Sequence, residues 1–174
     1  MIDRRPESTE YDPRFEPYMA LVPESGLIEI ISNQFAATAS FIASIPESKY
    51  DYRYAPDKWS VLEVFGHICD VERSYCYRLL VGARGDEVEL KRMNGYLYTQ
   101  NAEFGRFGLL EWLKEFEATR KSNLLFLQHI PDAAWDRAAQ LGGSSITVRA
   151  LGYFMVGHER HHLHILKEKY LKNA

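Results

Sequence analysis

Apolar residues recur at intervals of three or four positions in four separate stretches of the chain, with polar residues between them. This spacing places the apolar side chains on one face of an α-helix. The first stretch predicts a helix that begins after Pro23, near residue 24, and ends before Pro46, because proline disfavours a helical residue before it. Its inward face holds five apolar and two polar residues: Leu27, Ile30, Ile31, Gln34, Thr38, Phe41 and Ile45.

The second predicted helix has a clear start signal. Ser60 is a good N-cap residue, and Glu63, three positions later, completes a capping box. The apolar face continues to about residue 82, so the sequence predicts a helix over residues 61–82. Residues 84–103 carry turn signals and no sustained period, and a connection of that length inside a compact domain is usually functional or mobile.

Two further helices follow in the second half of the chain. The third is predicted from about residue 107 to the residue before Pro131. A short helical turn over residues 132–138 and a glycine-containing connection over 141–145 lead to the fourth helix, expected from Thr147 to about Leu171. We find no alternating run long enough to predict a β-strand.

Four amphipathic segments of similar length, joined by connections of unequal length, are typical of an all-α four-helix bundle. The two long connections argue against simple up-down-up-down wiring. Residues 1–23 lack a sustained period, and we interpret them as an irregular N-terminal arm in front of a bundle domain over residues 24–174.

The composition fits one soluble globular domain of 174 residues, with 46% hydrophobic and 26% charged residues. A net charge of −3 gives no electrostatic reason to expect nucleic acid or an anionic membrane as a partner. No run approaches the roughly 18 apolar residues of a membrane span, and the N-terminus has no apolar signal segment. Cys69 and Cys76 fall on the apolar side of the second helix, as in proteins of a reducing compartment, so we expect a cytoplasmic protein.

Four of the six histidines lie within residues 158–164 of the fourth helix. His158 and His162 fall in the middle of the apolar face, His161 lies on its flank, and His164 points away. Buried imidazoles need polar partners, and an i, i+4 histidine pair can converge on one divalent metal ion. Hydrogen bonds to a carbonyl or a carboxylate are the alternative.

A stable metal site needs a third donor, and the helical pattern does not decide which residue provides it. His129 projects from the side of the third helix opposite its apolar face. His67 lies on the polar shoulder of the second helix, beside Glu63 and Asp70, so periodicity leaves it open.

The letters from His158 to His162 also match H-E-x-x-H, in which two histidines bind zinc and the glutamate activates water. A metalloprotease of that kind needs a third ligand further along the chain and a sheet edge that binds substrate. Only twelve residues follow His162, and no sheet is predicted, so we disfavour this interpretation.

Three polar residues on otherwise apolar helix faces are candidates for ligand binding: Gln34, Thr38 and Arg120. Arg120 can grip a carboxylate with two parallel hydrogen bonds, as an acidic substrate or a thiol cofactor would require. The alternative is an arginine paired with a glutamate of the protein itself. Asp70, Glu63 and Glu159 are candidate acceptors for imidazole N–H groups.

Two motifs together resemble a known family. Residues 59–70, WSVLEVFGHICD, resemble the W-S-x-x-E-x-x-x-H-x-x-D stretch of the DinB-like family of damage-inducible four-helix bundles. The pair His158-x-x-x-His162 resembles the second signature of that family, and the resemblance covers about residues 25–170. It implies a divalent metal, most often zinc or nickel, held by His67, His158 and His162.

The resemblance also implies an activity, because members of this family are commonly transferases or isomerases that use bacillithiol, mycothiol or glutathione. We therefore expect a metal-dependent transferase that activates such a thiol for S-transfer to a small electrophile, with Arg120 and Gln34 binding the cofactor. The alternatives are a non-catalytic metal-binding stress-response bundle and a metal-dependent hydrolase. The expected partners are the small-molecule thiol or electrophile and a second copy of the chain in a homodimer.

Overall fold

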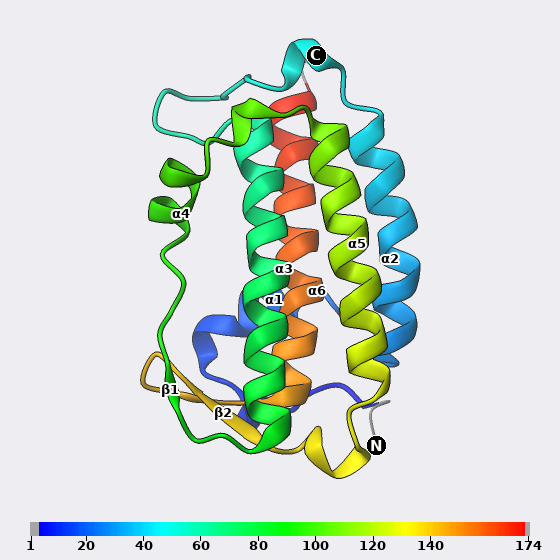
Figure 1. Ribbon diagram of the computed structural model, residues 1–174, viewed down its shortest axis with the longest axis vertical. Helices are drawn as coiled ribbons and strands as arrows, with labels where there is room; N and C mark the ends of the chain where they lie inside the picture. The colour runs from blue at the N-terminus through cyan, green and yellow to red at the C-terminus, as the bar shows by residue number, and fades with distance from the viewer. Residues whose placement is uncertain (1–3, 173–174) are drawn as a thin grey trace.

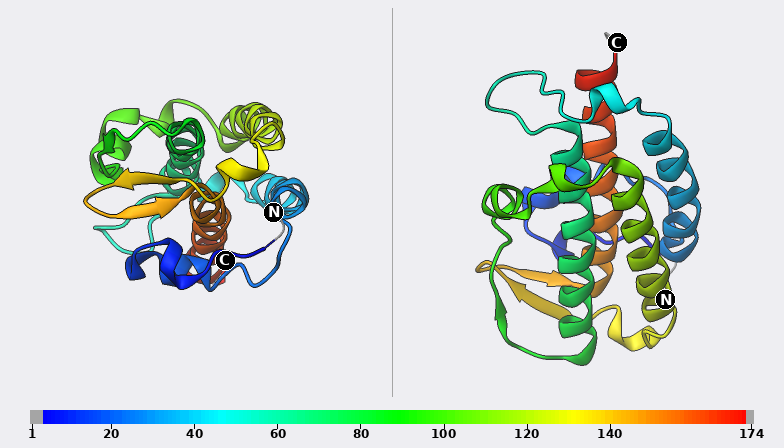
Figure 2. Two further views of the ribbon diagram at one scale, coloured as in Figure 1. Left: turned by 90° about the horizontal axis from the view of Figure 1, so that it is seen from below. Right: turned by 45° about the horizontal axis from the view of Figure 1, so that its top comes forward.

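Four long helices form the body of the protein in the computed structural model, which describes residues 4–172. Helix α2 packs against α5, α5 against α3, and α3 against α6 (Figures 1 and 2). The predicted four-helix bundle is therefore confirmed. The helices are α2 (Leu27–Ala43), α3 (Val61–Arg84), α5 (Leu109–Gln128) and α6 (Val148–Ile165), and α6 continues as a π-helical segment, Leu166–Leu171.

The helices do not alternate in direction. α2 and α6 run one way and α3 and α5 the other (Figure 1). This is achieved by the connection after α3, which returns along the length of the molecule, so that α5 begins at the same end of the bundle as α3. The long connections thus exclude up-down-up-down wiring, as the sequence predicted.

Local chemistry explains where the helices begin and end. The Glu63 backbone N–H donates to the Ser60 hydroxyl over 3.2 Å, and the Ser60 N–H donates to the Glu63 carboxylate over 2.7 Å, which confirms the predicted capping box. α2 begins at Leu27, three residues after the predicted start, because Gly26 adopts the left-handed conformation (φ +86°). Within residues 4–172, no helix is both long and apolar enough to cross a membrane.

The prediction that the chain has no β-strand was wrong. Strands β1 (Glu89–Leu90), β2 (Ala138–Leu141) and β3 (Ser145–Thr147) form a small sheet in the order β1-β2-β3. β1 pairs with β2 in parallel, and β2 pairs with β3 in an antiparallel hairpin. The hairpin turn uses Gly142 and Gly143, both at positive φ, as tight two-residue turns require.

The two connections expected to be irregular contain further elements. The connection before α5 includes β1 and the helix α4 (Gly95–Ala102), followed by a 3₁₀ turn at Phe104–Arg106. The helical turn predicted over residues 132–138 is restricted to Asp132–Ala134, because the following residues enter β2. These elements cover α3 on its outer side, as Figure 2 shows.

The N-terminal arm folds onto the bundle. It contains 3₁₀ turns at Ser8–Glu10 and Pro13–Phe15 and the short helix α1 (Glu16–Met19), which contacts α6. Phe15, Met19 and Val22 are buried in the core. The first three residues of the predicted arm and the last two of the predicted bundle domain lie outside the described residues.

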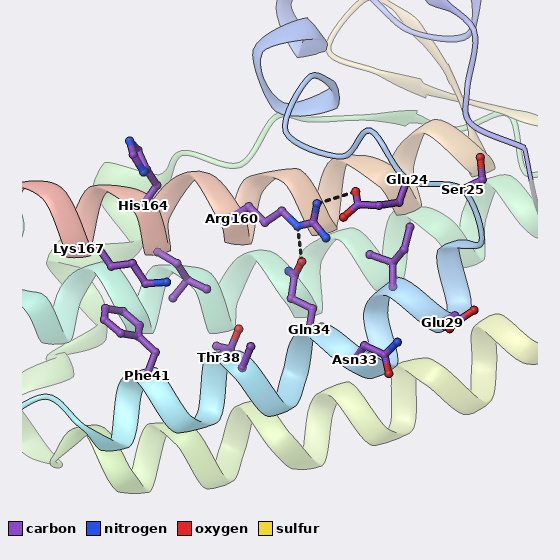
Figure 3. Close-up of a pocket in the computed structure, with 13 residues that line it drawn as sticks. Glu24, Ser25, Glu29, Asn33, Gln34, Thr38, Phe41, Arg160, His164 and Lys167 are labelled. Carbon is purple, nitrogen blue, oxygen red and sulfur yellow. Dashed lines mark hydrogen bonds and ion pairs between the residues drawn. The ribbon is translucent and has the colours of Figure 1, made fainter.

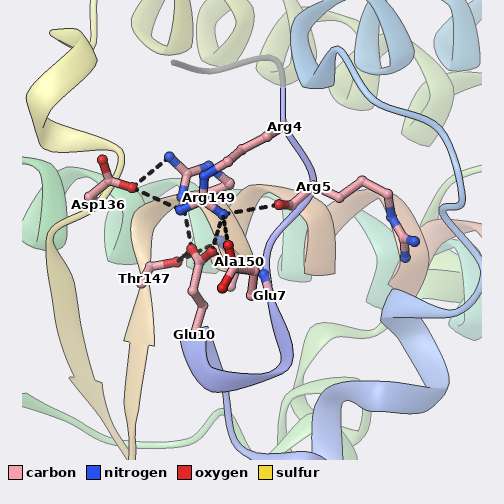
Figure 4. Close-up of polar contacts among 8 residues, drawn as sticks. All are labelled: Arg4, Arg5, Glu7, Glu10, Asp136, Thr147, Arg149 and Ala150. Carbon is pink, nitrogen blue, oxygen red and sulfur yellow. Dashed lines mark hydrogen bonds and ion pairs between the residues drawn. The ribbon is translucent and has the colours of Figure 1, made fainter.

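A cluster of charged residues fixes the start of the arm to the base of α6 (Figure 4). The fully buried Arg149 donates to Glu10 over 2.9 Å and to Asp136 over 2.7 Å. The Thr147 hydroxyl also donates to Glu10, over 2.8 Å. These contacts connect the arm, the short sheet and α6.

The apolar core has two parts along the bundle. One contains the C-terminal half of α3, the first two turns of α6, the arm and the sheet. The other contains the N-terminal part of α3 together with residues of α5 and the last turns of α6. A layer of buried polar side chains lies between these two parts, and the candidate site belongs to this layer. Its residues are Thr38, His67, Glu72, Arg120, Asn123, His158 and Glu159.

Candidate metal centre

Three histidines from two helices converge in the polar layer. α3 provides His67, and α6 provides His158 and His162 one turn apart. The Nε2 atom of His158 lies 3.2 Å from Nε2 of His67 and 3.1 Å from Nε2 of His162. His67 and His158 are buried and His162 is partly buried.

The surroundings keep all three imidazoles neutral. Burial lowers the pKa of His67 to about 4. Burial is also the main reason that the pKa of His162 falls to about 3, with a smaller contribution from the nearby His67 and His161. Burial, and to a smaller extent the neighbouring histidines, lowers the pKa of His158 well below its usual value. Neutral imidazole is the form that ligates metals, so the cluster needs no proton loss at neutral pH.

The geometry of the three nitrogens fits a divalent metal ion. Metal–nitrogen bonds of about 2.0–2.1 Å at tetrahedral angles place two ligand nitrogens roughly 3.3 Å apart, close to the two separations observed here. Hydrogen bonds between the rings satisfy the cluster less well than a metal ion. Both contacts of His158 involve the same Nε2 atom, and that nitrogen can take part in only one N–H···N hydrogen bond. Among the described residues, no fourth histidine, cysteine or carboxylate joins the group. Three protein donors leave a coordination position open, as in catalytic zinc sites.

Neighbouring residues hold the rings in place. Trp59 packs against His67 with ring centroids 4.7 Å apart, and Tyr18 of the arm packs against His158 at 5.8 Å. At Gly95, the first residue of α4, an added Cβ would lie 2.9 Å from Cε1 of His67. The absence of a side chain at this position therefore allows α4 to lie directly against the imidazole.

His67 and His158 also line a cavity of about 250 Å³ between the arm, α3, α6 and the connection before α5. Its remaining walls are mostly aromatic or apolar, with two arginines and no carboxylate among the described residues. They are Arg14, Phe15, Tyr18, Val71, Tyr75, Arg92, Met93, Gly95, Leu141 and Phe154.

Arg120 is engaged with carboxylates of the protein itself. It donates to Glu72 over 2.9 and 3.0 Å and to Glu159 over 2.8 Å, and all three side chains are buried. Burial disfavours the charged guanidinium, but attraction and hydrogen bonds from Glu159 and Glu72 outweigh this and raise the pKa of Arg120. The structure therefore shows the alternative weighed for Arg120, an arginine paired with glutamates, and gives no support for a role in cofactor binding.

Gln34 and Thr38 belong to the same network. Both donate to the carboxylate of Glu159 over 2.5 Å. Among the described residues, no hydrogen bond joins Glu159 to the three histidines, and its carboxylate instead accepts from Gln34, Thr38 and Arg120. The Glu159 carboxylate therefore connects α6 to polar side chains of α2 and α5. Glu72, which also binds Arg120, connects α3 to the same network.

Gln34 also faces a second cavity, of about 620 Å³, between α2 and α6 (Figure 3). Its amide oxygen accepts from Arg160 over 2.7 Å, and Arg160 also pairs with Glu24 at 2.8 Å. None of the three clustered histidines lines this cavity; its only histidine among the described residues is the exposed His164. Gln34 is therefore placed away from the cavity that contains His67 and His158.

The remaining predicted residues lie where their spacing indicated or are engaged elsewhere. His129 is exposed and His161 is partly buried outside the cluster. Glu63 is bonded to Ser60 and Arg53, and it does not support His67. Burial raises the pKa of the Cys76 thiol to about 12 and raises that of Cys69 further, so neither is a nucleophile at neutral pH.

Sequence reasoning missed Glu72, the burial of Glu159 beside it, and the arginines of the histidine cavity. Glu159 follows Met155 by four positions on α6, so helical spacing contained a signal for its burial. Arg14 and Arg92 carry no such signal, because they lie in the arm and in a connection.

Comparison with known proteins places this geometry in a family. The family model of the DinB superfamily matches residues 31–166, more than three quarters of the chain. The chain belongs to the DinB superfamily. This match confirms the resemblance recognised in the two histidine motifs. A comparison with curated protein sequences found no match.

Two solved structures show the same fold. YfiT from Bacillus subtilis, described as a probable metal-dependent hydrolase with an unusual four-helix bundle topology, superposes with a TM-score of 0.74 and 14% identity over 98% of this chain and 94% of its own. A mycothiol-dependent maleylpyruvate isomerase gives a TM-score of 0.65 with 8% identity, over 79% of this chain and 57% of its own. At these identities the likeness shows the fold alone.

Proposed function

We propose that this DinB-superfamily protein is a metal-dependent transferase that activates a low-molecular-weight thiol for S-transfer to a small electrophile. The observation that carries the proposal is the convergence of three neutral imidazoles beside a cavity, with Nε2 of His158 3.2 Å from Nε2 of His67 and 3.1 Å from Nε2 of His162. These histidines are the residues that would hold a divalent ion such as zinc or nickel. When bound, such an ion supplies Lewis acidity that lowers the pKa of a thiol or a water molecule.

The cavity walls support a thiol as the activated group. Phe15, Phe154 and Met93 offer apolar contacts that suit a soft sulfur atom, and the burial of the site limits access of water. Activation of water usually also needs a general base, but no carboxylate lines the cavity among the described residues. A thiol has an ordinary pKa of about 8.5 and ionises with much less assistance.

Two observations bear on the alternatives. The likeness to YfiT over nearly the whole chain favours a metal-dependent hydrolase as the second candidate. A purely structural metal site in a non-catalytic bundle is less well supported, since such sites normally have four protein donors and the group here has three. The name of the mycothiol-dependent isomerase, which shares the fold, is consistent with thiol chemistry.

Metal analysis and conjugation assays test the proposal together. Protein purified without chelator should contain about one equivalent of metal, and the His158→Ala variant should contain almost none. His164→Ala is the matched control, because this histidine lies exposed on the same helix and should leave the metal content unchanged.

The loaded protein is then incubated with bacillithiol, mycothiol or glutathione and a generic chloronitroarene electrophile. We expect thioether formation with at least one thiol, and loss of that activity in His158→Ala. Hydrolysis of a p-nitrophenyl ester without thiol, at a rate dependent on His158, would favour the hydrolase. Bound metal with neither reaction would support the non-catalytic bundle.

A further inference from the structure

The cavity over the histidines contains positive charge without a matching carboxylate. Arg14 from the arm and Arg92 from the connection before α5 both line it. Among the described residues, Arg92 makes no ion pair, and Arg14 has only Asp12, at 3.8 Å from its Nε. The pocket is therefore electropositive even before a divalent cation is held by the histidines, although the whole chain carries a net charge of −3.

A third arginine lies behind Tyr75, one of the residues that line the cavity. Arg78 is buried, and its guanidinium lies 4.4 Å from the ring centroid of Tyr75, which lines the cavity. It donates to the Lys91 carbonyl over 3.0 Å, its Nη1 has no hydrogen-bond partner, and it forms no ion pair with a described carboxylate. Buried charges in proteins are normally paired, so an unpaired arginine here indicates that negative charge comes from outside the chain.

Strand β2 and its turn also position the two arginines that line the cavity. The Nη2 group of Arg14 donates to the Leu141 carbonyl over 2.9 Å, which anchors the guanidinium while its buried Nε stays without a hydrogen-bond partner. Arg92 lies across the hairpin turn, where an added Cβ at Gly142 would be 2.6 Å from its Cγ. Both side chains are thus placed by β2 and its turn.

We propose that the cavity binds a small organic carboxylate, with Arg14 and Arg92 holding its charge and Arg78 adding to the field from behind Tyr75. The inference rests on the proposed function insofar as this carboxylate belongs to the substrate or to the thiol. The aromatic walls, with Tyr75 and Phe154 stacked at 4.4 Å, select a carboxylate that has an apolar or unsaturated body. Arg14 comes from the arm, which lies outside the residues 31–166 that the family model matches.

Calorimetric titration with simple carboxylates tests the proposal. Acetate, maleate and benzoate are titrated into the metal-loaded and the metal-free full-length protein, with benzamide as the neutral counterpart of benzoate. We expect at least one carboxylate to bind both forms and benzamide to bind neither. Arg14→Gln and Arg92→Gln should each weaken carboxylate binding roughly tenfold or more, because each removes a charge-assisted hydrogen bond.

Two controls keep the test specific. Arg106→Gln removes an exposed arginine that does not line the cavity and should bind like the wild type. Arg14→Lys keeps the charge and should recover part of the affinity. The proposal is overturned if no carboxylate binds, if benzamide binds as tightly as benzoate, or if the Arg14 and Arg92 variants bind unchanged.

Failure of the proposed function gives a different result. Absence of metal, or bound metal without thiol conjugation, would remove the transferase but leave carboxylate binding to the metal-free protein intact. If the Arg14 and Arg92 variants kept wild-type carboxylate affinity while the protein still bound metal and conjugated the thiol, only the proposal of a carboxylate site would be refuted.

Discussion

The three clustered histidines make the metal-free protein sensitive to acid. The pKa of His67 is about 4 in the folded protein, against an ordinary value of 6.5, so the unfolded chain binds more protons between these limits. Stability therefore rises with pH in this window, and it falls as the pH is lowered from about 6.5 towards 4. The expected slope is about 1.4 kcal/mol per pH unit for each histidine that stays neutral only when folded.

Urea unfolding of chelator-treated protein at several pH values across this window measures the slope. His158→Phe should reduce it, since one of the buried imidazoles is gone, whereas His164→Ala should not. Metal-loaded protein should unfold at higher urea concentration near neutrality and lose that advantage on acidification. A metal-free protein equally stable at both ends of the window would contradict the neutral state of the cluster.

The same substitution should change the free energy of unfolding by very different amounts at two buried arginines. Arg120→Met leaves Glu72 and Glu159 buried without their cation, and we expect a loss of about 3–5 kcal/mol in the free energy of unfolding. Arg78→Met removes a buried charge that has no described carboxylate partner, so its effect should stay within about 1 kcal/mol. Chemical denaturation of both variants at neutral pH gives the comparison, and equal losses would show that the two arginines are held in the same way.

At the scale of elements, the close approach of the arm to α6 at Tyr18 requires a glycine in α6. An added Cβ at Gly157 would lie 2.2 Å from the backbone oxygen of Tyr18, which cannot move without shifting the arm. We expect Gly157→Ala to lower stability by about 1–3 kcal/mol despite the better helix propensity of alanine, with a clear fall in Tm. Gly105→Ala is the control, because nothing lies within 4 Å of an added Cβ there. Equal melting temperatures for the two variants would refute this close contact.

The helices could be predicted from the sequence because their signals are local. Apolar spacing, the Ser60 capping box and the prolines lie within each helix or next to it, and the predicted limits differ from the observed ones by only a few residues. The strands could not be predicted in this way. β1 has two residues and pairs with β2 across about fifty positions, as in Glu89 with Gln140, so neither strand shows a period of its own.

The candidate site was predictable only in part for a related reason. His158 and His162 followed from spacing on α6, but His67 appeared on a polar shoulder of α3 and entered only through the family resemblance. In the structure α3 is buried on most of its circumference, because α4, the 3₁₀ turn at Phe104–Arg106 and strand β2 cover sides that an isolated bundle would expose. Helical periodicity assumes one buried face, and on α3 that assumption fails.

For the whole molecule, the polar layer between the two apolar clusters combines two kinds of site. The Arg120 network joins α2, α3, α5 and α6 with charges that are satisfied internally. Among the described residues, the Nε2 atoms of the three histidines in the same layer have contacts only with one another, and His67 and His158 line a cavity. The network can therefore fix the relative positions of α3 and α6, and with them the spacing of His67 and His158, without itself contacting a ligand.

The arm completes this arrangement, and its attachment can be tested separately from the metal centre. Glu10 accepts hydrogen bonds from Arg149 and Thr147, and the arm places Arg14 and Tyr18 in the cavity wall. Glu10→Gln keeps the size of the side chain but removes the negative charge that pairs with the buried Arg149. An open state, in which the arm is detached from α6, should therefore become more populated. Limited proteolysis with trypsin should then cut after Arg14 roughly tenfold faster or more, since cleavage follows the open population.

The two readouts should separate in this variant. Metal content should stay at the wild-type level because the histidines lie on α3 and α6, whereas carboxylate affinity should fall because Arg14 is no longer held. Glu7→Gln is the control, since Glu7 is exposed and its carboxylate forms an ion pair with the exposed Arg4 at 3.6 Å. If Glu10→Gln lost metal and carboxylate binding together, the arm would be part of the fold of the bundle itself, and its role as a separate wall of the cavity would be refuted.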